Sequence, residues 1–409
     1  MFYDLAIGIY DLLVHLAAPF SRKPRKMMKG HWVVYELLRQ QVEKGEQYIW
    51  FHAASLGEFE QGRPLIEMIR EKYPDYKILL TFFSPSGYEV RKHYRGADIV
   101  CYLPFDKPRN VKKFLDIATP CMAFFIKYEF WKNYLDELHK RRIPVYSVSS
   151  IFRRDQIFFK WYGGTYRNVL KDFDHLFVQN EASKRYLSKI GISRVTVVGD
   201  TRFDRVLDVR NQARELPEFE RFVGERCQTL IAGSSWPQDE EILIPYFNEH
   251  PEMKLIIAPH EIHREHLMYI ESLLKRPSVR LSDVMQDKSL LEGKDCLIVD
   301  SFGLLSSIYR YGTIAYIGGG FGAGIHNTLE AAVYGIPVLF GPRFQKFKEA
   351  RDLIKVGGGF SVASKDEFVA KMDELLTYAE VLKAAGESAG QFVKGNAGAT
   401  DGILKELAL

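Results

Sequence analysis

The chain has 409 residues. At roughly 150 residues per domain this is the length of two or three domains, which excludes a single small binding module. Its 56 Lys and Arg against 52 Asp and Glu leave a net charge of +4, too small over this length for a dedicated nucleic-acid-binding protein. The 46% hydrophobic and 26% charged fractions are those of an ordinary globular protein and exclude disordered and fibrous classes.

Residues 1–20 are mostly apolar but contain Asp4, Asp11 and His15, which a membrane-spanning helix would have to bury at high cost. With Gly8 these residues share one helix face, and the other face is apolar, with Phe2, Leu5, Ile9, Leu12, Leu13 and Leu16. A basic cluster without acids follows, made of Arg22, Lys23, Arg25, Lys26 and Lys29. This combination predicts an amphipathic helix that lies on an anionic membrane surface.

Two alternatives to membrane contact are a signal peptide and a first helix packed on the body with a solvated basic turn after it. A signal peptide places its basic residues before the apolar stretch, and the order here is the reverse. The packed helix remains the competing interpretation.

From residue 47 onward, short apolar runs alternate with helix-length amphipathic segments, which predicts parallel sheets with helices on both faces. The alternation lapses into a polar stretch at residues 199–226 and then resumes. We therefore expect two doubly wound α/β domains facing each other across a cleft, with ligands at the carboxyl ends of the strands. The expected boundaries are 1–30 for the membrane-associated helix and basic segment, 31–205 and 206–385 for the two domains, and 386–409 for a C-terminal helix that closes the domain pair.

Two carboxylates in the first domain follow predicted strands. Glu58 comes after QYIWFHAA, in Ser55-Leu56-Gly57-Glu58, and Glu129 comes after CMAFFI. Carboxylates at neighbouring strand ends can supply a general base and a positioning group for a hydroxyl nucleophile. The spacing of Ser55 and Glu58 also fits a capping box, and Glu129 also fits simple charge compensation at a helix start.

The second domain offers material for binding an anion. Gly233-Ser234-Ser235-Trp236-Pro237 lies between a predicted strand and a helix, where amides and hydroxyls can hold a phosphate, although ordinary capping explains it nearly as well. A glycine-rich segment, residues 318–324, precedes a predicted helix at 327–334 and favours a phosphate at a helix start over a dinucleotide fingerprint.

No metal site is predicted. Asp172-Phe173-Asp174 precedes a predicted strand and therefore lies at the wrong end for a ligand, and the four cysteines show no zinc spacing.

Taken together, several motifs resemble the 3-deoxy-D-manno-octulosonic acid (Kdo) transferases of lipopolysaccharide synthesis, which are inverting two-domain glycosyltransferases of the GT-B type. The motifs span nearly the whole chain: HAASLGE (52–58), TFFSPSG (81–87), YLPFD (102–106), EFWKN (129–133), GDTRFD (199–204), GSS (233–235) and the stretch 318–342. The apolar first helix with its basic follow-on is also usual for that family.

The resemblance implies a role for particular residues. Glu58 matches the catalytic carboxylate, and the acceptor side includes Ser55, Gly57, Ser86, Gly87, Glu129 and Arg202. The donor side, for CMP-Kdo, includes Ser234, Ser235, Trp236, His260, Gly318, Gly319, Gly320, His326, Asn327 and Glu330. The chain departs from the family in having Lys127 where many relatives have an acid, and Arg202 in place of a frequent Lys.

The expected reaction is transfer of Kdo from CMP-Kdo to a lipid A precursor (lipid IVA) at the cytoplasmic face of the inner membrane, with inversion, Glu58 as base and no metal or other cofactor. The expected partners are the lipid A precursor and anionic membrane lipid, with no nucleic acid. Two alternatives remain open: a GT-B-like transferase or epimerase that uses UDP-sugars, and a non-catalytic membrane-bound protein that binds a nucleotide sugar.

Overall fold

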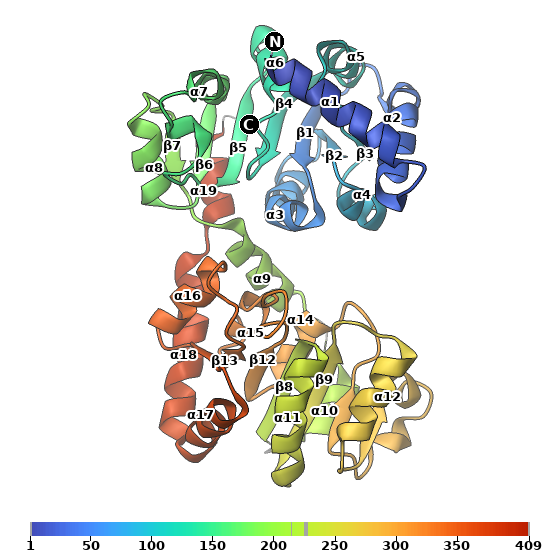
Figure 1. Cartoon of the computed structure of the whole chain (residues 1–409), viewed down its shortest axis with the longest axis vertical. Helices are drawn as coiled ribbons and strands as arrows, with labels where there is room; N and C mark the ends of the chain where they lie inside the picture. Colours follow the sequence, from blue (N-terminus) through green and yellow to red (C-terminus); the bar gives the residue numbers. More distant parts are fainter. Residues whose placement is uncertain (1, 214, 225–227, 408–409) are drawn as a thin grey trace. The chain divides into compact units, whose positions relative to one another are not determined.

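Two parallel sheets form the framework of the computed structural model, which describes residues 2–213, 215–224 and 228–407 (Figure 1). The chain divides into unit 1, Met1–Arg205 with Ala397–Leu409, and unit 2, Val206–Asn396. The boundary falls inside helix α9 (Thr201–Asn211). Each unit contains one sheet of seven strands, which confirms the predicted pair of α/β domains.

The sheet of unit 1 has the strand order β3-β2-β1-β4-β5-β6-β7, and all its neighbours pair in parallel. The strands are β1 (Tyr48–Ala53), β2 (Lys77–Phe82), β3 (Ile99–Tyr102), β4 (Pro120–Ile126), β5 (Val145–Ser150), β6 (His175–Val178) and β7 (Val195–Val197). The helices are α1 (Phe2–Ala17), α2 (Arg22–Gln41), α3 (Leu56–Lys72), α4 (Pro85–Arg91), α5 (Pro108–Ala118), α6 (Lys132–Lys140), η1 (Ile157–Phe159), α7 (Gly164–Lys171), α8 (Glu181–Ser188) and α19 (Ala399–Glu406).

Strand β1 shows why a continuous apolar run forms a central strand. Tyr48 and Trp50 enter one core, with side chains of α2, α5 and α6, whereas Ile49 and Phe51 enter the core on the opposite face, with side chains of α3. A strand covered by helices on both faces has no polar face, so its sequence does not alternate.

The sheet of unit 2 has the order β10-β11-β9-β8-β12-β13-β14 and is also parallel throughout. Its strands are β8 (Gln228–Ser235), β9 (Met253–Pro259), β10 (Ser278–Arg280), β11 (Cys296–Ile298), β12 (Ile314–Ile317), β13 (Val338–Phe340) and β14 (Gly359–Ser361). The helices are α10 (Pro217–Val223), α11 (Pro237–Glu249), α12 (Arg264–Leu273), α13 (Leu281–Val284), η2 (Lys288–Leu291), α14 (Leu305–Ile308), η3 (Tyr309–Tyr311), α15 (Leu329–Ala332), α16 (Lys348–Lys355), α17 (Lys365–Thr377) and α18 (Ala379–Asn396).

Two segments differ from the sequence expectation. The helix expected at 327–334 is a single turn, α15, after which the chain turns and Gly335 takes a φ of 74°. The final segment does not divide at residue 386, which lies inside α18; it divides at Ala397, so that α18 belongs to unit 2 and α19 to unit 1. Gly398, with a φ of 102°, begins α19, and its amide donates to Asp204.

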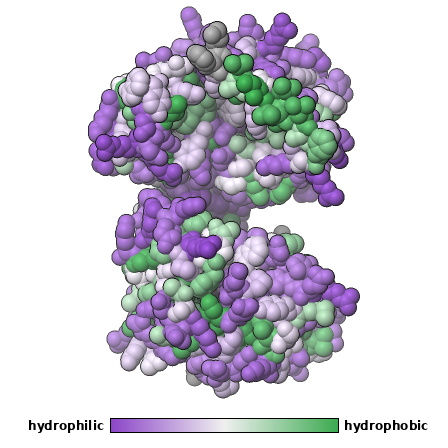
Figure 2. Space-filling model, in the orientation of Figure 1, coloured by the Kyte–Doolittle hydropathy of each residue, from purple (hydrophilic) through white to green (hydrophobic). Residues whose placement is uncertain are grey.

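The first helix packs on unit 1 through polar side chains and also through Val14, which is buried against Tyr102 and Phe105. The Tyr3 hydroxyl donates to Asp106, Asn133 donates to Asp4 at 3.0 Å, and Lys107 pairs with Asp11. The opposite side of α1 is solvent-exposed and apolar, with Leu5, Ile9, Leu12, Leu13 and Leu16 each about half exposed or more, and Phe20 at 92%. Figure 2 shows hydrophobic surface gathered over this helix. The side chain of Phe2 is outside the described part.

No single helix among the described residues has both the length and the apolar character to cross a membrane. Within the described part of the chain, α1 and α2 reach that length and apolar character only when the two helices are counted together. The pair is bent by 115° at the break between them.

Candidate active site

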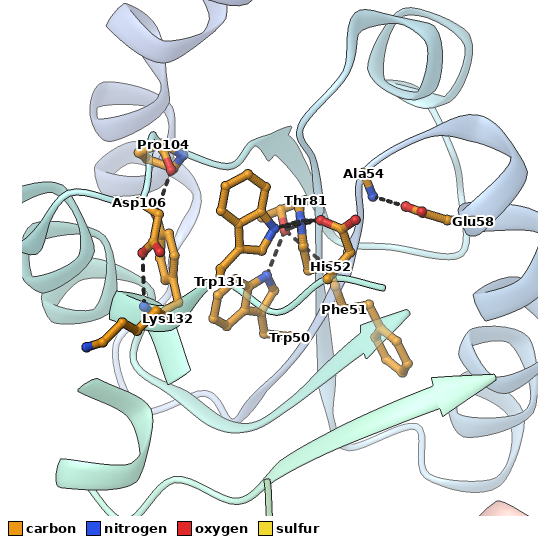
Figure 3. A network of polar contacts seen from close by, with 12 residues as sticks. Trp50, Phe51, His52, Ala54, Glu58, Thr81, Pro104, Asp106, Trp131 and Lys132 are labelled. Carbon is orange, nitrogen blue, oxygen red and sulfur yellow. Dashed lines mark hydrogen bonds and ion pairs between the residues drawn. The ribbon is translucent and has the colours of Figure 1, made fainter. Parts of the chain in front are cut away.

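Glu58 lies at the carboxyl end of β1, where the strand order of unit 1 reverses between β2 and β4. This is the edge at which parallel α/β sheets bind ligands. The Glu58 carboxylate accepts the amide of Ala54 at 2.6 Å (Figure 3). The Ser55 side chain makes no capping hydrogen bond, so the alternative interpretation, a complete capping box, is not formed. Glu58 is partly exposed, which leaves it accessible to a substrate.

The environment of Glu58 makes it an unusually strong base for a carboxylate. Burial and then the nearby negative charge of Glu129 raise its pKa to about 7, against the opposing effects of the Ala54 amide and the Lys127 cation. A pKa near neutrality suits a general base, because the group is deprotonated at working pH and still holds a proton well.

Glu129 follows β4 and is held by two aromatic side chains. Trp131 Nε1 donates to Glu129 Oε2 at 2.6 Å, and His52 Nε2 lies 3.2 Å from the same oxygen. His52 comes from the end of β1 and is fully buried, and its Nδ1 lies 2.9 Å from Thr81 Oγ1 on β2. Figure 3 shows Trp50, His52, Thr81 and Trp131 converging in this network.

The backbone next to these side chains is strained. Lys127 and Ser149, after β4 and near the end of β5, have φ of 67° and 56°, a region that residues other than glycine rarely adopt. Such residues cluster at functional sites, where the surrounding structure holds them in place.

The other residues expected on the acceptor side lie at the same edge of the sheet, after β1 and β2. A Cβ on Gly57 would meet no atom within 4 Å, so the space beside it is open. Ser86 is exposed and its hydroxyl lies 3.0 Å from that of Ser84. Gly87 has a packing role, because a Cβ there would lie 2.3 Å from the Phe82 ring.

Arg202 lies in unit 1, at the start of α9. Its guanidinium pairs with Asp200 at 2.8 Å. Burial raises the pKa of the nearby Tyr128 hydroxyl, and the charges of Asp200, Glu58 and Arg202 also affect that pKa.

In unit 2, the glycine-rich segment after β12 lies against the end of β8. A Cβ on Gly318 would lie 2.2 Å from the Ser234 carbonyl, and one on Gly320 would lie 2.5 Å from the backbone of Gly341. Gly319 has a φ of 90°. The glycines are therefore needed for close backbone approach.

Three rings stack beside this segment. His260 lies between Trp236, with 4.7 Å between ring centroids, and His326, with 4.4 Å. Trp236 Nε1 also donates to His326 Nε2 at 3.3 Å. Burial, together with the neighbouring His260, lowers the pKa of His326 to about 4, so this ring is neutral at physiological pH. A neutral His326 ring within an aromatic stack suits a nucleobase or sugar better than a phosphate anion.

The two serines of the GSS motif differ in their surroundings. Ser234 is partly exposed with a φ of 53°, whereas Ser235 is fully buried and donates to Glu240 at 2.8 Å. Asn327 and Glu330 form a pair, with Asn327 Nδ2 donating to Glu330 Oε1 at 2.9 Å. The structure thus brings the expected donor residues of unit 2 to the ends of β8, β9 and β12.

Sequence reasoning missed the side chains that support both sites. In unit 1 these are His52, Thr81 and Trp131. In unit 2, Asp239 is buried and accepts the amides of Trp236 and Gly319, at 2.9 and 2.8 Å, which ties the two loops together. The available signals were that His52, Thr81 and Trp131 belong to the motifs HAASLGE, TFFSPSG and EFWKN, and that an acid lies in the first turn of α11.

No group of three or more His, Cys, Asp or Glu side chains suited to a metal ion occurs in the described ranges 2–213, 215–224 and 228–407. Cys101 and Cys296 are buried free thiols and Cys121 is a partly buried one, whereas Cys227 is outside those ranges.

Comparison with known proteins gives this geometry a context. Residues 31–205 match the family model of the 3-deoxy-D-manno-octulosonic-acid transferases (kdotransferases). The 3-deoxy-D-manno-octulosonic acid transferase of Aquifex aeolicus is 28% identical over 349 residues, covering 83% of this chain and 89% of that protein. The enzyme of the same name from Rickettsia bellii is 26% identical and covers 98% of this chain and 96% of its own.

Among solved structures, the UDP-GlcNAc 2-epimerase of Neisseria meningitidis bound to UDP-GlcNAc superimposes with a TM-score of 0.62 at 14% identity. The match covers 88% of this chain and 99% of the epimerase. At this identity the likeness concerns the fold alone.

Proposed function

We propose that this chain is a glycosyltransferase that transfers Kdo from CMP-Kdo to a hydroxyl of a lipid A precursor, lipid IVA. The match of residues 31–205 to the Kdo transferase family model and the similarity to two 3-deoxy-D-manno-octulosonic acid transferases support the proposal. The observation that carries this proposal is the Glu58 carboxylate, partly exposed at the carboxyl end of β1 and with its pKa raised to about 7.

In the proposed step, Glu58 takes the proton of the acceptor hydroxyl while the oxygen attacks the anomeric carbon of Kdo. The bond from that carbon to the phosphate oxygen of CMP breaks, and CMP leaves with the bonding electrons. This single displacement inverts the anomeric centre. Ser55, Gly57, Ser86, Gly87, Glu129 and Arg202 would line the acceptor side.

Unit 2 would hold the donor. The amide of Gly320 and the hydroxyl of Ser234 are suited to the phosphate, because a preorganised set of donors stabilises the charge that develops on the leaving group. The amides of Gly318 and Gly319 donate to the Gly233 carbonyl and to Asp239, so these two glycines would shape the loop that holds the donor. The stacked Trp236, His260 and His326 would contact the nucleoside or sugar, and Glu330 its hydroxyls. We propose that no metal takes part, so that activity persists in EDTA and added Mg²⁺ does not increase it.

We further propose that the protein works at the cytoplasmic face of the inner membrane, as a peripheral or monotopic protein. Support comes from α1, whose polar residues are taken up by Asp106, Lys107 and Asn133 while its apolar side is exposed. A contiguous exposed apolar surface next to basic residues is the form of an interfacial membrane contact.

Donor use tests the proposed function. The protein is incubated with vesicles that contain tetraacylated lipid A precursor and with either CMP-Kdo or a UDP-sugar, and released CMP or UDP is measured. We expect acceptor-dependent release of CMP. Release of UDP alone would establish a transferase that uses UDP-sugars, and conversion of the UDP-sugar into its epimer without release of UDP would establish an epimerase. No release and no conversion would support a protein that only binds.

A further inference from the structure

The Glu129 carboxylate is engaged on one oxygen by two side chains that come from different elements. Trp131 Nε1 is 2.6 Å from Glu129 Oε2 and also 3.1 Å from His52 Nε2, which itself lies 3.2 Å from that oxygen. Glu129 is only 11% exposed at its side chain, and His52 is not exposed at all. A carboxylate as buried as this retains its charge only where hydrogen-bond donors replace water.

The hydrogen bonds behind His52 determine which of its nitrogens carries the proton. Thr81 Oγ1 accepts from Trp50 Nε1 at 2.8 Å, and it has one proton of its own to donate, either to His52 Nδ1 at 2.9 Å or to the Phe51 carbonyl at 3.3 Å. If Thr81 donated to the carbonyl, neutral His52 would turn the lone pair of Nε2 toward the Glu129 anion. Donation to Nδ1 leaves Nε2–H directed at Glu129, so every group in the chain from Trp50 to Glu129 has a partner.

The ring of Trp131 is also held from its outer side. Phe83 packs against it with 4.8 Å between centroids, and Phe83 in turn stacks on Tyr10 of α1 at 6.1 Å. The indole N–H therefore has one preferred direction, toward Glu129 Oε2. The second oxygen of Glu129 is not engaged by this pair.

We infer that His52 and Trp131 are positioning residues that hold the Glu129 carboxylate beside the base Glu58. The inference rests on the proposed role of Glu58. It assigns a role to each of three segments. Strand β1 supplies His52 and leads into Glu58, and the loop after β4 supplies Glu129 and Trp131. Strand β2 supplies Thr81, which fixes the orientation of His52.

The consequence for the reaction concerns the strength of the base. The groups that face Glu58 are Glu129, Lys127 and Tyr128 from the loop after β4, and the amides of Ala54 and Ser55 at the start of α3. Of the charged ones, Glu129 favours the protonated form of Glu58 and Lys127 the deprotonated form. If Glu129 turned away, its negative charge would no longer add to the effect of burial on Glu58. The pKa of Glu58 would then be lower, and Glu58 would be a weaker base.

The test is the pH dependence of kcat for Trp131→Phe, which removes the N–H and keeps the ring, for His52→Gln, and for Glu129→Gln. We expect each variant to shift the acidic limb to lower pH, by on the order of one pH unit, because Glu58 is no longer opposed by a fixed negative charge. The plateau should fall by up to about tenfold, because a base that is weaker by one pKa unit is less effective by at most that factor. Trp161→Phe, at a 90% exposed tryptophan of the same unit, is the matched control and should leave both quantities unchanged.

The double variant Trp131→Phe/Glu129→Gln separates positioning from a general loss of packing. If Trp131 acts through Glu129, the double variant has the same acidic limb as Glu129→Gln alone. An acidic limb of Trp131→Phe at the wild-type pH, or shifts that add in the double variant, would overturn the inference. Glu58→Gln is measured in parallel: if it abolishes transfer while Trp131→Phe shows no shift, only the positioning role is wrong, whereas an active Glu58→Gln would reject the proposed base itself.

Discussion

At the scale of single residues, the account depends on Glu58. Its carboxylate is held by the Ala54 amide, so it is fixed in direction, and its partial exposure leaves room for an acceptor hydroxyl. A simple capping role would require only the hydrogen bond, whereas catalysis also requires the raised pKa. The two interpretations therefore differ in what they predict for activity.

Glu58→Gln keeps the size and hydrogen-bonding ability of the side chain and removes the base. We expect the rate of Kdo transfer to fall by at least ~100-fold, since general base catalysis is typically worth that much, while CMP still binds to unit 2. Glu71→Gln, at an exposed position on the same helix, is the control. Turnover within about tenfold of wild type, ~1.4 kcal/mol of barrier, would make Glu58 a helix cap.

The pH dependence of kcat follows from the same group. The active form of Glu58 is deprotonated, and its pKa is raised to about 7 by burial and by Glu129. The rate should therefore fall about tenfold per pH unit below this value and level off above it. An acidic limb near the ordinary pKa of a glutamate, measured with a substrate whose own groups do not titrate in this range, would contradict the proposed environment.

At the scale of elements, the glycine-rich segment 318–324 combines a structural and a functional demand. A Cβ on Gly320 would lie 2.5 Å from backbone atoms of Gly341, and this backbone cannot move without shifting β13. A Cβ on Gly322 would have no neighbour closer than 3.7 Å. We predict that Gly320→Ala destabilises unit 2 by ~1–3 kcal/mol and weakens CMP binding, and that Gly322→Ala does neither. Thermal unfolding and CMP titration of both variants measure this; equal behaviour of the two would reject the packing argument.

The first helix and the basic turn after it form the second element with a testable role. Arg25 donates to the carbonyls of Ala18 and Pro19 and Lys26 pairs with Glu89, so reversing their charges would also disturb the fold. Reversal of Arg22, Lys23 and Lys29 avoids this. Each cation near an anionic surface contributes roughly 1 kcal/mol, so the triple variant should sediment far less with anionic vesicles at low salt.

A second variant, with serine at Leu12, Leu13 and Leu16, should also bind vesicles less than wild type does. This loss of binding should be the same at low and high salt, because the contact removed is apolar and is not screened by ions. Met268→Ser, which removes an exposed apolar side chain from α12 in unit 2, should bind vesicles as wild type does. Equal sedimentation of wild type and both N-terminal variants at every salt concentration would leave α1 as a packed helix with a solvated turn after it.

The polar face of α1 is partly engaged by the domain. The helical spacing predicts that Asp4, Asp11 and His15 share one face. In the structure Asp4 and Asp11 contact Asn133 and Lys107, and Asp4 and His15 are both exposed. The helical spacing predicted which residues share a face, but it contains no information about which partner each face meets.

At the scale of the whole molecule, the central strands were predictable because a strand covered on both faces leaves a continuous apolar run. The three-residue strands β7, β10 and β14 were not predicted. They lie at the edges of the two sheets and lack the continuous apolar run that identifies the equally short β11 and β13. The site was predictable only in part: Glu58 and Glu129 follow strands, whereas the His52, Thr81 and Trp131 network joins three segments that are distant in sequence and requires the sheet order β2-β1-β4.

The most direct test of the central claim is mass spectrometry of the lipid product formed from CMP-Kdo and tetraacylated lipid A precursor. We predict that the wild-type protein adds at least one Kdo residue to the precursor and that Glu58→Gln adds none under the same conditions. An unmodified precursor with the folded wild-type protein, or an equal yield of Kdo-modified lipid with Glu58→Gln, would contradict the account.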